Sequence, residues 1–326
     1  MNGNNSQARL MDACKICQNA ANNRRHIARE MMFGLRDPFT YLECSQCGCV
    51  QLLDIPPDMA KYYPKDYYSF QPHGSLMTFL RHQWSAYAYG RKNLLGWIVA
   101  RLFFANQAMM AVRRANIPKD AHILDVGCGS GHLLLDLHHL GFRTVAGVDP
   151  YLQHDLVYPR GPTVFKRELS GLQGQYDLIM LHHAYEHMDQ PAEVMRHLAR
   201  LLKPTGKVIL RIPIADSYAW RHYNVNWVNL DAPRHFYLHT RKSIEILASQ
   251  AGLKIEEVVC EGTAYQFWCS EQYLRDIPLT DPRSCTSNSP SVVLTRMLNR
   301  EFKAKSDDLN KRQEGDLACF YLRKAA

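Results

Sequence analysis

The chain has 326 residues, of which 46% are hydrophobic, and a formal net charge of +8. This length accommodates one large domain and a smaller one, and the composition is that of a folded protein, not of a disordered or fibrous chain. The positive charge suits an anionic substrate, but basic residues are spread along the chain, which argues for a solvated basic surface and against nucleic acid as the partner.

The N-terminal region shows no targeting segment. The first 20 residues are polar and contain no apolar run typical of a signal peptide. The longest apolar stretch, residues 94–104, is interrupted by Arg101 and is too short to span a bilayer. It suits a helix packed on a core, with a helix lying on a membrane surface as the alternative. We therefore expect a cytoplasmic protein without a transmembrane segment.

Four of the ten cysteines form two Cys-x2-Cys pairs, Cys14 with Cys17 and Cys44 with Cys47. This spacing lets four thiolates converge tetrahedrally on one zinc ion. Because the protein would fill all four positions, we expect the zinc to be structural and to fold a segment with little core of its own. The alternative is a redox pair or a set of unrelated buried cysteines. Cys49 lies outside the regular spacing.

A glycine-rich turn follows the apolar run at 122–126. An acid, Asp125, stands near the end of that run. Glycines then occupy three alternate positions: Gly127, Gly129 and Gly131. The pattern is typical of a buried strand, a tight turn and the start of a helix, and glycine lets a ligand approach the bare backbone. A second acid, Asp149, ends the next apolar run about 20 residues later, where a carboxylate can hold ribose hydroxyls. Together these features predict a nucleoside site; a purely structural glycine turn is the alternative.

The spacing of the glycines indicates which nucleoside. In the dinucleotide-binding pattern the third glycine comes three residues after the second, but His132 stands there and the third glycine is Gly131. The pattern Asp-x-Gly-x-Gly-x-Gly resembles the first motif of class I S-adenosylmethionine methyltransferases. The resemblance implies that this motif, Cys128 included, lies along the amino-acid end of the cofactor and that Asp149 holds its ribose.

From about residue 119 the sequence alternates between strands and helices. Apolar runs predict strands near 122–126, 143–149, 163–166, 176–181, 207–212 and 253–260, and a closing strand at 317–322. Helices are expected over 192–202, where Lys203-Pro204-Thr205-Gly206 ends the helix, over 240–250 and within 291–313, with an exposed loop at 276–290. These elements predict a doubly wound, seven-stranded α/β sheet of the Rossmann-like type. The methyltransferase resemblance implies that the closing strand is antiparallel.

Two further motifs extend the resemblance over roughly residues 120–260. Glu186-His187 with Pro191, and Leu201-Leu202-Lys203-Pro204 with Gly206, are similar to the small-molecule group of these methyltransferases. We expect Glu186-His187 to cap the following helix or to shape the cofactor pocket. No Asn/Asp-Pro-Pro-Tyr motif follows the strand at 176–181. This lowers the expectation of methylation at an exocyclic base amine.

Two N-terminal segments resemble parts of bacterial sugar methyltransferases. Residues 41–52 are similar to the zinc-binding module fused to some of these enzymes, and the tyrosine-rich segment 62–70 resembles a segment of methyltransferases from polysaccharide and secondary-metabolite clusters. That segment either folds over the cofactor pocket as a lid or packs between two domains. We expect a zinc-binding module at 1–60, a helical and aromatic linker and lid at 61–118, and a methyltransferase domain at 119–326.

The same resemblance completes the set of expected cofactor contacts. Glu168, after the strand at 163–166, is placed near the adenine, and His182 contacts the methionine portion through its backbone. The expected cofactor-binding residues are Asp125, Gly127, Cys128, Gly129, Gly131, Asp149, Glu168 and His182.

Methyl transfer to a hydroxyl requires an aligned acceptor and a group that takes a proton, and the ordinary pKa of histidine suits that step. The aromatics of segment 220–239 suit a sugar ring, and the segment resembles the W…D-x-P-R-H segment of the polysaccharide-cluster group. We predict His235 as the base and Arg234 as a contact to an anion or the acceptor, with His183 in the same catalytic set. The alternative is that His235 only orders this loop through a carboxylate such as Asp231.

The sequence as a whole predicts an S-adenosylmethionine-dependent methyltransferase with an N-terminal structural zinc module. Its acceptor is expected to be a hydroxyl or carbon of a small molecule, such as a sugar or a related metabolite. One alternative is a ribosomal RNA methyltransferase, since some of those carry an N-terminal zinc module. The other is a non-catalytic S-adenosylmethionine-binding scaffold that holds a protein partner.

Overall fold

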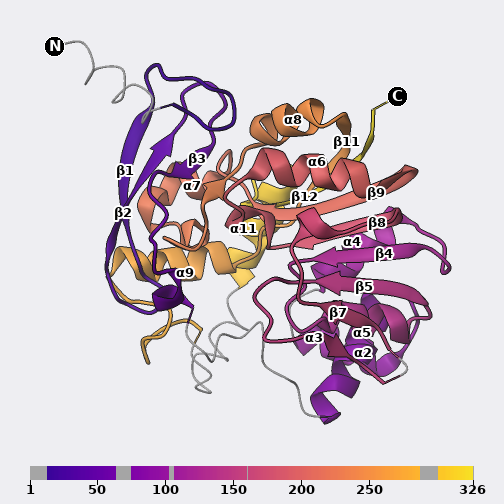
Figure 1. Ribbon diagram of the computed structural model, residues 1–326. Helices are drawn as coiled ribbons and strands as arrows, with labels where there is room; N and C mark the ends of the chain where they lie inside the picture. Colours follow the sequence, from indigo (N-terminus) through magenta and orange to yellow (C-terminus); the bar gives the residue numbers. More distant parts are fainter. Residues whose placement is uncertain (1–12, 64–74, 103–105, 160, 287–299, 326) are drawn as a thin grey trace.

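The computed structural model describes residues 13–63, 75–102, 106–159, 161–286 and 300–325. Two sheets form its framework, an eight-stranded mixed sheet and a four-stranded antiparallel sheet beside it (Figure 1). The α-helices are α2 (Ser75–Ala88), α3 (Leu94–Leu102), α4 (Gln107–Ala115), α5 (His132–His139), α6 (Pro191–Leu201), α7 (Tyr218–Tyr223), α8 (Arg241–Gln250), α9 (Tyr265–Leu274) and α11 (Arg300–Lys311). Across the described ranges, no helix combines the length and the apolar character needed to cross a membrane.

The large sheet has the strand order β11-β12-β9-β8-β4-β5-β7-β6. Its strands are β4 (His122–Val126), β5 (Thr144–Val148), β6 (Leu156–Val157), β7 (Thr163–Phe165), β8 (Tyr176–His182), β9 (Leu202–Pro213), β11 (Leu253–Cys260) and β12 (Leu317–Lys324). The strands from β9 to β7 run parallel, and β12 lies antiparallel between β9 and β11. The predicted doubly wound sheet, with its antiparallel closing strand, is confirmed, and β6 is an additional short edge strand.

Alternate residues of the central strands face two separate cores, because successive side chains of a strand point to opposite faces. Leu124 and Ile179 belong to the core beneath α6 and α8. Their neighbours Ile123 and Leu178 belong to the core shared with α2, α4 and α5. Both faces of the central strands are therefore buried, as a parallel sheet requires, and the carboxyl ends of the strands are left to carry a site.

The strand β9 begins earlier than predicted. The preceding helix ends at Leu201, one residue before the predicted end, and residues 203–206 belong to β9 instead of a separate turn. The reason is a register shift: Tyr176 of β8 pairs with Leu202, and the next pair joins Leu178 to Lys207. The extra residues of β9 form a bulge-like irregularity, and such an irregularity tolerates proline and glycine within a strand.

The helix α3 confirms a helix in the apolar stretch that begins at residue 94, and residues 103–105 lie outside the described ranges. Its apolar side chains are only partly covered, because Leu94 is 73% and Trp97 41% exposed. The expectation that this stretch packs on a core therefore holds for one face of the helix, which includes the buried Val99.

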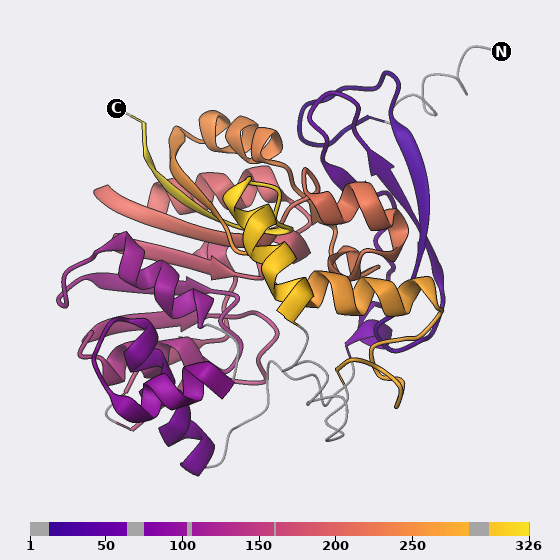
Figure 2. The same cartoon turned by 180° about the vertical axis from the view of Figure 1, so that it is seen from behind.

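The C-terminal insertion is partly as predicted. Within the expected helical region, α11 spans Arg300–Lys311, and the part before residue 300 is not described. Figure 2 shows α11 (yellow) next to α9, and Leu309 of α11 shares a core with Phe267 of α9. The preceding loop is not wholly exposed, because Ser284 is buried and hydrogen-bonds the side chain of Gln272 at 3.1 Å.

The small sheet draws its strands from two distant parts of the sequence. It has the order β1-β2-β3-β10, with β1 (Arg24–Arg29), β2 (Pro38–Glu43), β3 (Val50–Leu52) and β10 (Tyr237–Leu238). Pairing of Tyr237 with Gln51 and of Leu238 with Val50 joins the loop after β9 to the N-terminal strands. One buried core, which includes Tyr41 and Trp227, lies between this sheet and the helices α7 and α9. The N-terminal segment is thus held by residues that follow the fifth predicted strand.

Candidate active site

The glycine turn after β4 adopts the conformation that its residues allow. Gly127, Gly129 and Gly131 all have positive φ, at 69°, 54° and 77°, and Gly131 precedes the first residue of α5. A Cβ atom at Gly127 would lie 2.6 Å from Cβ of Ala184, and one at Gly131 would lie 2.5 Å from Val164. Glycine is therefore required at these two positions by both backbone angle and space.

The two acids of the motif lie beside this turn. Asp149 accepts hydrogen bonds from the backbone N–H groups of Gly129 at 2.9 Å and Tyr151 at 3.0 Å, so its carboxylate is fixed while lone pairs are left for further donors. Burial raises the pKa of Asp149. Asp125 is also buried, and burial together with the charge of Asp149 raises its pKa to about 8. We call the three glycines with Asp125 and Asp149 the glycine cradle.

The other predicted cofactor residues surround the cradle. Cys128 is partly buried and packs so closely on Gly147 that a Cβ there would clash with its sulfur. Glu168 is exposed just after β7, and its charge helps to raise the pKa of Tyr151, whose first cause is burial. His182 ends β8, and neither of its ring nitrogens has a hydrogen-bond partner among the described residues. Burial, aided by the charge of Arg211, holds the pKa of His182 well below its ordinary value.

A cluster of histidines around one glutamate lies where β8 ends. His183 has a left-handed backbone with φ of 53°, its side chain is 42% exposed, and its Nδ1 lies 3.4 Å from Oε1 of Glu186. Glu186 and His187 follow in a short 3-10 helix, Tyr185–His187. The ring of His187 meets that of His235 edge to face, with centroids 4.7 Å apart. We call His183, Glu186, His187 and His235 the histidine cluster.

The buried glutamate is ionised within this cluster. Glu186 has no exposed surface, and burial by itself would favour its protonated form. The nearby imidazoles of His183, His187 and His235 outweigh that effect and lower its pKa to about 2. The sequence predicts that Glu186-His187 caps the following helix or shapes the cofactor pocket. The sequence carries no signal that this pair contacts His235, because the contact forms only in the tertiary fold.

The loop between β9 and β10 holds His235 and Arg234 in different environments. His235 Nδ1 lies 2.7 Å from the backbone oxygen of Asn229, and its Nε2 lies 3.9 Å from Asp231. Arg234 has no exposed surface, and its guanidinium donates to Asp231 at 2.6 Å, to Glu30 at 3.0 Å and to the backbone oxygen of Tyr62 at 3.3 Å. The structure thus places Arg234 between the loop and the N-terminal segment, with its donors occupied by protein.

The aromatics of this loop do not face an open space. Trp220, Tyr223 and Trp227 are each at most 4% exposed and belong to the core beside the small sheet. The expectation that they line a sugar site is corrected: they pack against α9, and Nε1 of Trp227 donates to Asp316 at 3.0 Å.

The tyrosine-rich segment is described only at its start, because residues 64–70 lie outside the described ranges. Tyr62 is buried and donates to Asp37 at 2.7 Å, and the hydroxyl of Tyr63 lies 3.3 Å from Nδ1 of His187. This places Tyr63 beside the histidine cluster.

The four cysteines of the N-terminal pairs converge as their spacing predicts. Sγ of Cys14 lies 3.6 Å from that of Cys47, and Sγ of Cys17 lies 3.4 Å from that of Cys44. The four sulfurs all lie within 4.8 Å of one another. Backbone N–H groups of residues 16 and 46 point at sulfur atoms at 3.4 Å, which favours thiolates. Cys49 lies outside the set and is buried 4.0 Å from Nδ1 of His239.

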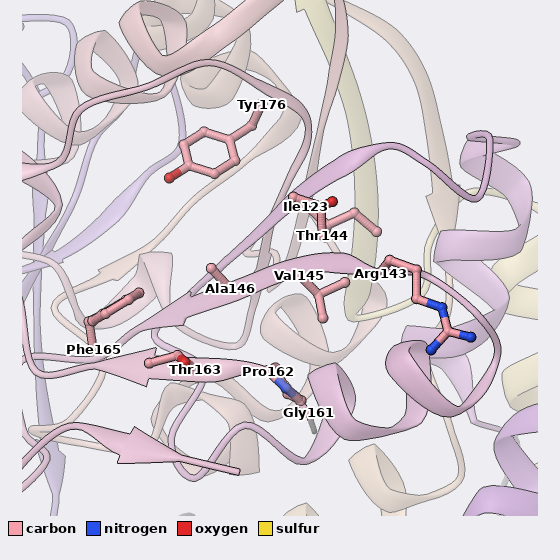
Figure 3. Close-up of a pocket in the computed structure, with 10 residues that line it drawn as sticks. All are labelled: Ile123, Arg143, Thr144, Val145, Ala146, Gly161, Pro162, Thr163, Phe165 and Tyr176. Atoms are coloured by element: carbon pink, nitrogen blue, oxygen red, sulfur yellow. The ribbon is translucent and has the colours of Figure 1, made fainter. Parts of the chain in front are cut away.

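A hollow of about 310 Å³ opens elsewhere on the large sheet (Figure 3). It is lined by residues of β4, β5 and β7, with the side chains of Arg143, Phe165 and Tyr176 at its margin. Its lining contains no residue of the glycine cradle or the histidine cluster. We therefore locate the candidate site at the carboxyl ends of the strands and not in this hollow.

Comparison with known proteins identifies the family of this chain. Residues 93–258, about half of the chain, match the family described as "Methyltransferase domain". The chain is 32% identical over 171 residues to the ubiquinone biosynthesis O-methyltransferase of Xanthomonas axonopodis pv. citri, which covers 46% of this chain and 69% of that protein. The enzyme of the same name from Thiobacillus denitrificans is 31% identical over 153 residues, 42% of this chain and 66% of the relative.

Solved structures give looser similarities. A cyclopropane synthase from Mycobacterium tuberculosis has a TM-score of 0.44 at 15% identity, covering 73% of this chain and 88% of that one. Magnesium protoporphyrin IX methyltransferase from Synechocystis, solved with S-adenosylhomocysteine, has a TM-score of 0.39 at 19% identity, covering 62% and 94%. From the family match and the sequence relatives, the chain belongs to the class I S-adenosylmethionine-dependent methyltransferases.

Proposed function

We propose that the protein methylates a hydroxyl or carbon atom of a small, carbohydrate-like acceptor. The observation that carries the proposal is the meeting of the glycine cradle and the histidine cluster at one edge of the large sheet, where Ala184 beside His183 abuts Gly127. The relatives named O-methyltransferases support an oxygen acceptor. The carbohydrate character rests on the resemblance of segment 41–52 to the zinc-binding module of sugar methyltransferases.

The residues of the glycine cradle fit the cofactor. S-adenosylmethionine, when bound, supplies a methyl group that its sulfonium already activates. Asp149 is held in place by two backbone N–H groups and offers its remaining lone pairs to the ribose hydroxyls. The ring nitrogens of His182 have no hydrogen-bond partner within the part of the chain that the structure describes, which leaves polar capacity at the end of β8 for the amino-acid portion. Asp125, Cys128 and Glu168 complete the proposed set, with Glu168 toward the adenine.

On the acceptor side we assign the proton step to a histidine of the cluster. His183 is the more exposed candidate, and the ionised Glu186 beside it stabilises the imidazolium that forms. His235 is the second candidate, since its Nδ1–H donates to a carbonyl and its Nε2 keeps a lone pair. We assign Arg234 a positioning role, because it fixes the loop that carries His235.

We further propose that Cys14, Cys17, Cys44 and Cys47 hold one structural Zn²⁺. The donor set is four sulfurs of suitable spacing, with backbone N–H groups directed at two of them. Protein fills every position, so the ion has no open position for substrate.

The decisive experiment measures turnover of labelled S-adenosylmethionine against nucleotide sugars, lipid-linked glycans and RNA. Methylation of a nucleotide sugar or a glycan supports the proposal. Methylation of RNA with steeply salt-dependent binding assigns the protein to ribosomal RNA instead. Tight cofactor binding without turnover on any of these acceptors would favour a scaffold, and absence of cofactor binding by folded protein would remove the activity altogether.

A further inference from the structure

The histidine cluster contains a second group of potential metal ligands. One carboxylate oxygen of Glu186 and one ring nitrogen each of His187 and His235 lie within 4.8 Å of one another. Glu186 and His187 are neighbours in the short helix after β8, whereas His235 comes from the loop before β10. The backbone N–H of Phe236 donates to the carbonyl oxygen of Glu186 at 2.8 Å, which holds the two segments together.

Both imidazoles are oriented by backbone carbonyls. Nδ1 of His187 lies 2.8 Å from the carbonyl oxygen of Arg234, and Nδ1 of His235 lies 2.7 Å from that of Asn229. A carbonyl oxygen only accepts hydrogen bonds, so each Nδ1 carries the proton and each Nε2 keeps its lone pair. Histidine ligands of metals are characteristically fixed in this way, by a hydrogen bond from the nitrogen that does not bind the metal.

The carboxylate of Glu186 lacks the donors that its burial demands. The residue has no exposed surface, and neither of its oxygens has a hydrogen-bond partner among the residues that the structure describes. The nearest nitrogen is Nδ1 of His183, 3.4 Å from Oε1. An ionised carboxylate is costly to bury without charge or hydrogen bonds to compensate it. A cation between this carboxylate and the two imidazoles supplies the missing partner.

We propose that Glu186, His187 and His235 bind a divalent transition-metal ion. Two imidazoles and one carboxylate are the donors that suit zinc, iron(II) and similar ions, and three protein ligands leave open positions. The site contains no sulfur, which separates it chemically from the four-cysteine cluster. Its ligands come from the segments that border the acceptor side of the glycine cradle.

The site also bears on the proposed reaction, and this step rests on the proposed function. An acceptor hydroxyl in an open position of the ion loses its proton more readily, because the metal charge stabilises the alkoxide. Nε2 of His235, once ligated, has no lone pair for a proton. Occupancy by the ion therefore leaves His183 as the proton acceptor.

The test uses the full chain and Co²⁺ as the probe. Metal-depleted protein is titrated with Co²⁺ and followed by absorption and by metal content after dialysis. The cysteine cluster gives sulfur-to-metal charge-transfer bands, whereas the proposed site gives only the weaker bands of nitrogen and oxygen ligands. We expect wild-type protein to retain about one ion per chain beyond the cysteine cluster. Glu186→Gln and His187→Gln should each remove this ion and leave the sulfur-to-metal bands unchanged.

Glu261→Gln is the matched control, because Glu261 is a largely buried acid near the same strand ends that already receives a hydrogen bond from Arg211 at 2.6 Å. The control should keep the second ion. Binding of S-adenosylhomocysteine and an unchanged unfolding temperature show that each variant is folded. The inference is overturned if wild type binds no ion outside the cysteine cluster, or if Glu186→Gln binds as much as wild type. Because the readout is metal binding, failure to find this ion refutes the site and leaves the proposed function standing, whereas failure of methyl transfer with the ion bound refutes the proposed function alone.

Discussion

The glycine cradle and the histidine cluster lie at the same edge of the sheet but are assembled in different ways. The cradle is built from two neighbouring β-strands and their following turns, and its hydrogen bonds join backbone N–H groups to Asp149. The cluster joins the turn after β8 to a loop that precedes β10. The loop in turn is fixed by Arg234, whose partner Glu30 lies in the N-terminal segment. A cofactor site can thus be local in sequence, while the residues proposed for the acceptor depend on long-range contacts.

The largest expected effect tests this long-range dependence. Replacing Arg234 with leucine leaves Glu30 and Asp231 without their buried cation. We expect a loss of roughly 3–5 kcal/mol in the free energy of unfolding. Arg36→Leu is the control, because its ion pair with Asp276 is exposed and should contribute far less. Denaturant unfolding followed by tryptophan fluorescence measures both variants; equal losses would contradict the special role of Arg234.

The cofactor side of the comparison is tested at Asp149. Asp149→Ala removes the acceptor proposed for two ribose hydroxyls, each hydrogen bond to a charged group being worth roughly 1.5–3 kcal/mol. Affinity for S-adenosylmethionine should fall by about 100-fold or more. Calorimetric titration provides the measurement, and Asp155→Ala, at an acid that caps the N–H of Lys166, should bind normally. Retained affinity in Asp149→Ala would place the ribose elsewhere.

The acceptor side is tested at His183. His183→Ala removes the proposed proton acceptor, so turnover on a hydroxyl acceptor should fall by roughly 100-fold. Cofactor affinity should not change, which separates the two sites. The exposed His154 offers a control at which alanine should leave both quantities intact. If His183→Ala turns over normally, the proton goes to another group, and His235 becomes the first alternative.

The last prediction concerns the charge of the glycine cradle in cofactor-free protein. Burial raises the pKa of Asp125 to about 8 from an ordinary value of 3.8, so the folded protein binds the proton more tightly than the unfolded chain. Stability of the cofactor-free protein should therefore fall as pH rises from about 4 to about 8. Asp125→Asn removes the group that causes this loss, so the variant should be more stable than wild type at pH 8, with a smaller difference at pH 5. The free energy of unfolding is measured for wild type and Asp125→Asn at pH 5 and at pH 8. If it changes equally between the two pH values in both proteins, this assignment is rejected.

The sequence was sufficient for the large sheet because its strands carry strong local signals. The apolar runs of β4, β8 and β12, the glycines after β4 and the capped start of α8 at Thr240 are all readable from neighbouring residues. The cysteine convergence followed from spacing for the same reason. Each of these features depends on residues close together in the chain or on a well-defined ligand geometry.

What the sequence could not predict depends on partners far along the chain. The strand β10 has only two residues and no periodicity of its own, so its pairing with β3 carries no local signal. The burial of Trp227 and Arg234 arises from the core that this pairing creates. The carboxylate of Glu186 meets His235 only when both sheets are in place. The predicted roles of the individual site residues remain predictions, which the substitutions above are designed to check.

The pairing of β10 with β3 has a consequence for how the chain can be divided. His239, next to β10, bridges to Ile214 at the end of β9, and the hydroxyl of Thr240 donates to the carbonyl of Cys47 at 2.6 Å. A recombinant fragment starting near residue 119 would expose an unpaired strand edge and leave the guanidinium of Arg234 without Glu30. A recombinant form of the protein should therefore keep the first strands, even for work directed only at the methyltransferase sheet.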